Sequence, residues 1–403
     1  MRRLIWVLVF AGIFLGSSCE RARDEERRQA SAASPRLANL LSPEDRRGYA
    51  QALEPRLFSF PADHGPHRSY RNEWWYLTGN LETGEGRRFG FELTFFRFSL
   101  APAEAFEPGG PRSAWATNQV YIGHFAVTDV AARRFHAAER LSRGAVGLAG
   151  ARAEPFQVWL EDWSLGVPQA PEAGQDSGRW DLRARDRGIE LRLSLQPLKA
   201  PVLNGHRGLA QKSAEPGNAS YYYSIPRLKA AGELNIGGEE HAVSGLAWLD
   251  REWGSSGLAQ EQEGWDWFAL QLSDGSDLMF YNLRRTDGRQ DPHSAGTWTQ
   301  SDGRSIHLSQ DDVRLTVLNY WDSPQGGRYP MGWLVNIPRL ALELQVEPVL
   351  RAQELRATVR YWEGAVDVSG RRGDRTVNGM GYVELTGYAD EAAADNASPQ
   401  GPR

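Results

Sequence analysis

The sequence is poor in the residues from which metal and nucleotide sites are built. Its 403 residues include one cysteine, Cys19, which excludes an internal disulfide and a zinc site of several thiolates. The eight histidines are scattered without metal-ligand spacing, and there is no His-Glu-x-x-His motif. Phosphate-binding and dinucleotide-binding glycine motifs are absent, as is the Gly-x-Ser-x-Gly motif of many hydrolases. We therefore expect neither a nucleotide cofactor nor a metal.

The sequence also lacks an excess of positive charge. Its 46 basic and 51 acidic residues give a formal net charge of −5, which argues against nucleic-acid binding because that function needs a basic face. Hydrophobic residues make up 41% of the chain and aromatic residues 11%, including 15 tryptophans. This composition is typical of a globular protein, and the length favours two domains.

The only long apolar run lies at the N-terminus. Arg2 and Arg3 precede the apolar segment 4–15, which is shorter than the ~20 residues of a membrane-spanning helix, and small residues follow at 16–18. Residues 1–18 are therefore predicted to be a signal peptide. Cys19 directly after them resembles the lipidation site of a bacterial lipoprotein; ordinary secretion with a chance cysteine stays open.

The chain on either side of the predicted folded part is polar. Residues 19–54 are rich in charge, alanine and serine, and we interpret them as a flexible tether. The Ala/Asp/Pro-rich residues 390–403 are predicted to be a disordered tail. If Cys19 is lipidated, the membrane is a partner of the protein, which would be exported and would lie in the periplasm or on the outer membrane.

The folded part has the pattern of an all-β protein. Phe89, Phe91, Leu93 and Phe95 alternate with polar or small residues, and other segments alternate in the same way. Asp-Gly turn signals separate these segments, which favours antiparallel barrels or sandwiches. We predict one domain at 55–235 and a second at 236–389, with a short possible helix at 353–361.

A weak internal repeat supports two similar domains. Residues 73–76 (Glu-Trp-Trp-Tyr) open a strand that is followed by a turn and an apolar strand ending at Arg97. Residues 265–268 (Trp-Asp-Trp-Phe) open a second such unit, which ends at Arg284. The alternative is that any aromatic-rich hairpin has this pattern.

Carboxylates beside tryptophans are the main candidates for chemistry. The candidate acids are Asp250, Glu252, Asp266 and Glu73. Alternation along a strand places Asp250 and Glu252 on one face, and it places Asp266 on the face opposite its two flanking tryptophans. A structural role in salt bridges to Arg97, Arg251 or Arg284 is the competing interpretation, because a buried carboxylate needs a partner or a proton. The aromatic and loop residues that could line a binding site are Trp74, Trp75, Tyr76, Trp248, Trp253, Trp265, Trp267, Lys212 and Tyr222.

Several long motifs resemble a known family, the carotenoid 1,2-hydratases (hydroxyneurosporene synthases) within the broader AttH-like, lipocalin-like group. The motifs are NEWWYLTGNL at 72–81, GFELTFFR at 90–97, GHFAVTD at 123–129, PVLNGHRGLAQKSAEPGNASYYYSIPRL at 201–228, GLAWLDREWGSS at 245–256, GWDWFALQLSDGSDLMFYNLR at 264–284, YWEGAVDVSG at 361–370 and GYVELTGY at 381–388. The resemblance implies two consecutive lipocalin-like barrels with an apolar cavity at or between them. It also implies addition of water to a C=C bond of an isoprenoid or polyene, whereas related members catalyse cycloadditions.

Such a hydration needs an acid and no cofactor. The acid must keep its proton at rest, which an apolar, indole-lined site promotes by raising its pKa. We expect Asp250 or Asp266 to be this acid, Glu252 its partner or a water-positioning base, and Glu73 a second-rank acid. Trp74, Trp253, Trp265 and Trp267 would face the cation. A non-catalytic lipid carrier, a secreted hydrolase and a pericyclic catalyst remain the alternatives.

Overall fold

The described part of the chain is built almost entirely of antiparallel β-strands, which confirms the predicted all-β class. The structure is a computed structural model that describes residues 46–104, 113–168 and 178–389. The predicted signal peptide, Cys19, most of the predicted tether and the tail at 390–403 lie outside these residues. Within them, no helix has the length and apolar character needed to cross a membrane.

The first sheet contains thirteen strands. Along it the order is β4-β3-β2-β1-β13-β12-β9-β8-β7-β6-β5, and β10 and β11 also pair with β12. Because β5 and β6 lie against β3 and β4, the sheet curls until its two edges are neighbours. The strands are β1 (Asn72–Thr83), β2 (Arg88–Ser99), β3 (Gln119–Asp129), β4 (Arg134–Arg143), β5 (Ala149–Ala153), β6 (Phe156–Leu160), β7 (Trp163–Gly166), β8 (Trp180–Asp186), β9 (Ile189–Pro197), β10 (Val202–Leu203), β11 (Leu209–Gln211), β12 (Ala219–Ile236) and β13 (Glu239–Gly254).

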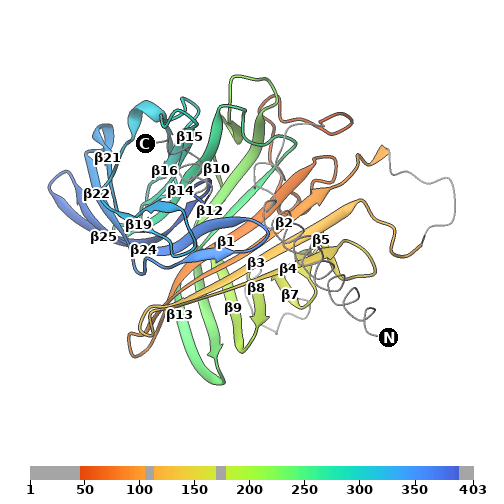
Figure 1. Cartoon of the computed structure of the whole chain (residues 1–403), viewed down its shortest axis with the longest axis horizontal. Helices are drawn as coiled ribbons and strands as arrows, with labels where there is room; N and C mark the ends of the chain where they lie inside the picture. The colour runs from red at the N-terminus through yellow and green to blue at the C-terminus, as the bar shows by residue number, and fades with distance from the viewer. Residues whose placement is uncertain (1–45, 105–112, 169–177, 390–403) are drawn as a thin grey trace, which may run out of the picture.

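The second sheet contains ten strands beside the first (Figure 1). Its order is β17-β16-β15-β14-β25-β24-β22-β21-β18, with β23 paired to β24, and β19 and β20 form a separate hairpin. The strands are β14 (Gln262–Leu272), β15 (Asp277–Arg285), β16 (Ala295–Thr299), β17 (Ser305–Ser309), β18 (Arg314–Val317), β19 (Tyr320–Asp322), β20 (Arg328–Pro330), β21 (Trp333–Ile337), β22 (Leu342–Pro348), β23 (Glu354–Arg356), β24 (Arg360–Arg372) and β25 (Arg375–Leu385). Three short 3₁₀ turns occur in the described residues, at η1 (Ala62–His64), η3 (Gln310–Asp312) and η4 (Pro338–Leu340).

The two sheets share one strand order. In each, four consecutive strands form a meander whose first strand also pairs with the last strand of that sheet: β1 with β13, and β14 with β25. The acid and arginine of the sequence repeat meet in both meanders, as Glu73 with Arg97 and as Asp266 with Arg284. The repeat seen in the sequence therefore corresponds to a repeated arrangement in space.

Two details of the sequence interpretation are wrong. β13 pairs with β12 and β1, so the change of sheet falls between Gly254 and Gln262 and not at residues 235 and 236. Gly237 and Gly238, next to the predicted boundary, have positive φ angles and form the tight turn between β12 and β13. The short helix considered at 353–361 is instead β23 and the start of β24.

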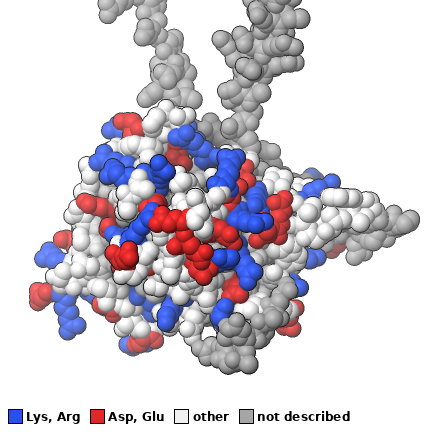
Figure 2. Space-filling model, turned by 90° about the horizontal axis from the view of Figure 1, so that it is seen from below, with Lys and Arg blue, Asp and Glu red and all other residues white. Residues whose placement is uncertain are grey.

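Burial patterns show where the sheets meet. β22 alternates between buried and exposed residues, as expected of a strand with one solvated face. β1 and the second half of β13 are buried almost without interruption. A cluster containing Tyr76, Trp248, Trp267 and Tyr382 fills the space between the sheets, separate from the core inside each. On the outer face shown in Figure 2, acidic and basic side chains are interspersed.

Candidate active site between the two sheets

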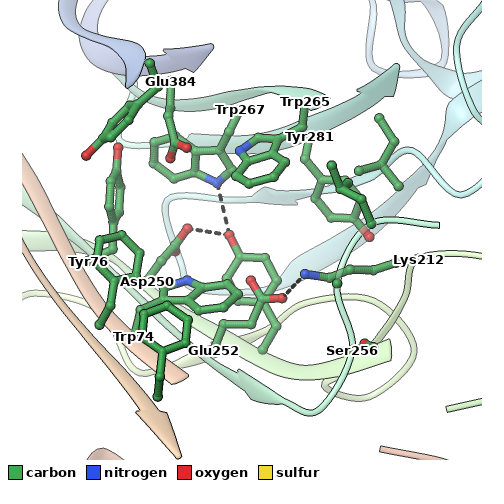
Figure 3. Close-up of a pocket in the computed structure, with 17 residues that line it drawn as sticks. Trp74, Tyr76, Lys212, Asp250, Glu252, Ser256, Trp265, Trp267, Tyr281 and Glu384 are labelled. Atoms are coloured by element: carbon green, nitrogen blue, oxygen red, sulfur yellow. Dashed lines mark hydrogen bonds and ion pairs between the residues drawn. The ribbon is translucent and has the colours of Figure 1, made fainter. Parts of the chain in front are cut away.

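A pocket lies where the two sheets face each other. One wall comes from the first sheet and the opposite wall from the second, and the segment joining the sheets closes one side (Figure 3). The position agrees with the expected cavity at or between two barrels. The pocket is lined by Trp74, Tyr76, Phe96, Phe98, Tyr222, Asp250 and Glu252 from the first sheet, by Trp265, Trp267, Tyr281, Leu283, Tyr361 and Glu384 from the second, and by Lys212, Ser256, Gly257 and Leu258 from connecting segments.

Strand alternation decides which side chains reach the pocket. On β1, Trp74 and Tyr76 line it, whereas Trp75 belongs to the core of the first sheet. On β13, Asp250 and Glu252 line it, whereas the neighbouring Arg251 is fully buried on the opposite face. The pocket therefore occupies the outer faces of these strands, and the barrel core lies behind them.

Asp250 is a buried carboxyl in the pocket wall. Its Oδ1 accepts hydrogen bonds from Ser224 Oγ at 2.5 Å and from Trp248 Nε1 at 2.7 Å, and its Oδ2 accepts one from the Tyr222 hydroxyl. Burial raises the pKa of Asp250 to about 7, against the lowering effect of these hydrogen bonds. Glu252, a like charge on the same strand, raises it further. Near neutral pH, the protonated and the ionised forms of Asp250 are therefore both populated.

Glu252 lies beside Asp250 and is paired with a cation. Lys212 Nζ forms an ion pair with Glu252 Oε1 (Figure 3). The Ser220 hydroxyl donates to the same oxygen. Lys212 also lies 5.3 Å from the centre of the Trp74 ring. The segment between β11 and β12 thus brings Lys212 to the pocket, as expected of a candidate binding residue.

Indole groups surround this carboxyl pair. Trp267 Nε1 donates to the Tyr222 hydroxyl at 3.1 Å, which connects the second wall to Asp250 through one side chain. Trp265 and Trp267 line the second wall, and Trp74 lines the first (Figure 3). Trp248 is buried, and its indole N–H holds Asp250. These four of the proposed tryptophans meet at the site.

Asp266 does not belong to the pocket, which corrects one of the two preferred acids. Its Oδ1 accepts bonds from Arg284 Nη1 at 2.5 Å and from the Tyr388 hydroxyl at 2.8 Å, and Asn282 binds the other oxygen at 3.0 Å. The alternation argument placed Asp266 opposite its flanking tryptophans. Because those tryptophans face the pocket, the acid between them faces the other way.

Glu73 also has a structural role. It is fully buried between Arg97 and Arg251, and its pKa is well below the usual range because these two charges outweigh the cost of burial. Trp75 lies under the Arg251 guanidinium, 3.9 Å from its centre. Trp253 stacks on His67 in the core, with ring centres 3.7 Å apart. None of these proposed residues lines the pocket.

The sequence interpretation missed a group of acids on the second wall. Glu384 on β25 lines the pocket and lies opposite Glu363 on β24 in the strand register. Burial raises the pKa of Glu384 to about 8, helped by the nearby Glu92. Burial likewise raises the pKa values of Glu92 and Glu363. The signal was available, because Glu384 alternates with Val383 and Leu385 on an apolar strand.

The site has polar groups for acid–base chemistry. Among the described residues, no group of three or more His, Cys, Asp or Glu side chains is arranged to hold a metal ion. What the pocket does contain is two carboxyls with raised pKa values, Asp250 and Glu384, and an ion pair, Glu252 with Lys212. This set can donate and accept protons inside an aromatic cavity.

The chain belongs to the AttH-like family, which it matches over residues 51–388. A crystal structure of a candidate AttH protein from Nitrosomonas europaea is 33% identical, with a TM-score of 0.73, and the match covers 84% of this chain and 99% of that one. The family resemblance found in the sequence motifs is thereby confirmed.

Two further relatives are more distant. Kievitone hydratase from Nectria haematococca has the same fold, with a TM-score of 0.63, 14% identity and coverage of 85% of this chain and 98% of that one. The dehydratase asqC of Emericella nidulans is 23% identical over 198 residues, which are 46% of this chain and 54% of that protein. The match thus spans about half the length of this curated relative.

Proposed function

We propose that the protein adds water to, or removes it from, a C=C bond of an apolar isoprenoid or polyene, without a cofactor. The single observation that carries this proposal is Asp250, a buried carboxyl with a raised pKa on the wall of an indole-lined pocket. Two relatives, a hydratase and a dehydratase, act in this reaction class by name. A hydratase adds water to a double bond and a dehydratase removes it, so the two names describe opposite directions of one reaction type.

In the hydration direction, protonated Asp250 transfers its proton to one alkene carbon. The π bond breaks, a C–H bond forms, and the other carbon becomes a cation. Trp74, Trp265 and Trp267 line the space in which that cation forms, and each indole face can stabilise it by up to ~2 kcal/mol when water is excluded. A water molecule then forms the C–O bond and loses one proton to a carboxylate.

The polar pair beside Asp250 fits the role of positioning that water. Glu252 is held by Lys212 and Ser220, so its carboxylate is fixed at the pocket wall. A fixed acceptor next to the proton donor orients water without reorganisation during the reaction. Ser256 and Leu258 of the joining segment also line the pocket.

The test is turnover in heavy-oxygen water. Purified wild-type protein is incubated with lycopene, squalene or farnesol in H₂¹⁸O, and products are analysed by mass spectrometry for one added ¹⁸O. Asp250→Asn keeps the size of the side chain and removes the titrating proton, so we expect turnover to fall by at least ~10²-fold. An active Asp250→Asn protein would contradict the assignment of the acid.

A non-catalytic carrier of apolar lipids is the second candidate. The aromatic lining supports it independently of the acids, since Phe96, Phe98, Leu258 and Leu283 provide an apolar surface. Binding of the same lipids, seen as quenching of tryptophan fluorescence, with no ¹⁸O incorporation would favour this function. Export and lipidation at Cys19 are part of the proposal in either case; labelling with radioactive palmitate, compared with Cys19→Ala, tests them.

A further inference from the structure

The two walls of the pocket are built in the same way. On the first wall, the register places Tyr76 opposite Asp250 and Trp74 opposite Glu252. On the second wall, it places Trp267 opposite Glu384. In both cases the aromatic residue is on the first strand of its sheet, and the acid is on the last strand, β13 or β25.

Glu384 enters the cavity from the side opposite Asp250 (Figure 3). No ion pair to Glu384 exists among the described residues, unlike Glu252 with its lysine. The Trp265 side chain lowers the pKa of Glu384, but less than burial raises it. A substrate that fills the space between the walls therefore meets one carboxyl on each side.

We propose that Glu384 is the second catalytic residue of the site. It exchanges a proton with the oxygen of water or of the hydroxyl group, while Asp250 exchanges a proton with the carbon. This inference rests on the proposed function and completes its proton balance. In hydration, Glu384 as carboxylate takes the proton that water loses when its oxygen bonds to the cation. In dehydration, protonated Glu384 gives that proton to the departing hydroxyl, and ionised Asp250 takes the proton from carbon.

Each direction needs one proton shared between the two carboxyls. With both groups protonated, no base is left; with both ionised, no acid is left. Neighbouring carboxyls also affect the protonation of Asp250 and Glu384. They are Glu252 on the first wall, and Glu92 and Glu363 near the second. Burial raises the pKa values of Glu92 and Glu363, and this favours the neutral forms of both carboxyls beside Glu384.

A pH profile separates this inference from the proposed function. If Glu384 is the partner of Asp250, kcat against pH is bell-shaped, with its maximum between the two raised pKa values, about 7 and about 8, and both limbs belong to the coupled pair. If Asp250 acts alone, the profile is a plateau at low pH that falls above about pH 7. A protein without turnover at any pH would refute the proposed function instead.

The variant test uses Glu384→Gln with Glu347→Gln as the matched control, because Glu347 is an exposed glutamate of the same sheet. We expect Glu384→Gln to lower kcat by at least ~10²-fold with farnesol or lycopene, with little change in KM, and to remove one limb of the profile. The control should keep the wild-type values. Wild-type kcat in folded Glu384→Gln would overturn the inference.

A measurement without turnover keeps the inference testable on its own. The carbonyl stretch of protonated carboxyls, followed by infrared difference spectroscopy between wild type and each variant, reports their titration. Removing Glu384 should delete one band that is present at pH 7 and lost above about pH 8, and it should shift the titration of the Asp250 band. A Glu384 band that is already absent at pH 6 would contradict the assignment.

Discussion

We predict that ionised Asp250 lowers the free energy of unfolding, and that replacing Asp250 raises this free energy above pH 7. Its pKa is about 7 in the folded protein against an ordinary value of 3.8, a rise of about 3 units. At 1.36 kcal/mol per unit, this corresponds to about 4 kcal/mol of destabilisation above pH 7. The sign follows from proton counting, because between pH 4 and pH 7 the folded state binds more protons at this site than the unfolded state. Stability therefore falls as pH rises through that window.

The variant Asp250→Asn removes the titration and keeps most of the contacts. The amide oxygen can accept the bonds from Ser224 and Trp248, whereas the Tyr222 hydroxyl loses its acceptor at a cost of about 1 kcal/mol. The expected net effect is a gain of about 3 kcal/mol in the free energy of unfolding at pH 8, and a loss of about 1 kcal/mol at pH 4.

Urea unfolding of both proteins at pH 4, 6 and 8, followed by tryptophan fluorescence, measures this difference. A variant that is inactive and also more stable at pH 8 would identify Asp250 as a residue retained for function. The reasoning is refuted if the difference in unfolding free energy between the two proteins does not change with pH. A pH-independent difference would mean that Asp250 is ionised throughout this range in the folded state.

Two further variants separate structural from catalytic acids. Asp266→Asn leaves Arg284 buried without its carboxylate, so we expect a loss of about 3 kcal/mol in urea unfolding but an unchanged kcat of the folded fraction; a folded, inactive protein would return Asp266 to the site. Lys212→Met leaves the Glu252 carboxylate without a cation and should cost about 1–3 kcal/mol, most of which Glu252→Gln should restore in the double variant. Additive losses in that double-mutant cycle would show that the two side chains are not coupled.

Strand alternation predicted the relative facing of side chains correctly. It separated Asp250 and Glu252 from Arg251, and Asp266 from the tryptophans on either side. It could not say which face of a strand borders the cavity, because both faces of β13 are buried. Asp266 therefore remained a candidate acid in the sequence. Because Trp265 and Trp267 line the pocket, the residue between them must face away from it.

The second wall was missed for a different reason. Glu384 and Glu363 lie within motifs that identify the family, and each has aromatic and aliphatic neighbours in the sequence, as the candidate acids Asp250 and Asp266 do. Only the packing of β24 and β25 against the first sheet brings Glu384 to the same cavity as Asp250. That contact joins residues more than a hundred positions apart, and no local pattern reports it.

The repeated strand order explains why the unpaired acids occur where they do. Within each sheet, the acid of the first strand forms an ion pair with an arginine near the end of the second strand: Glu73 with Arg97, and Asp266 with Arg284. These pairs close each meander on the face turned away from the pocket. The last strand of each sheet, β13 or β25, lies beside that first strand and presents its own acid on the other face.

Because the two sheets face each other, Asp250 of β13 and Glu384 of β25 lie on opposite sides of one cavity. Inside the first sheet, by contrast, the buried arginines Arg97 and Arg251 form ion pairs with Glu73, whose pKa is lowered. Among the described residues no arginine lines the pocket between the sheets, so buried Asp250 and partly buried Glu384 have no ion pair to arginine and have raised pKa values. The repeated strand order is thus the physical origin of two carboxyls with raised pKa values in one pocket.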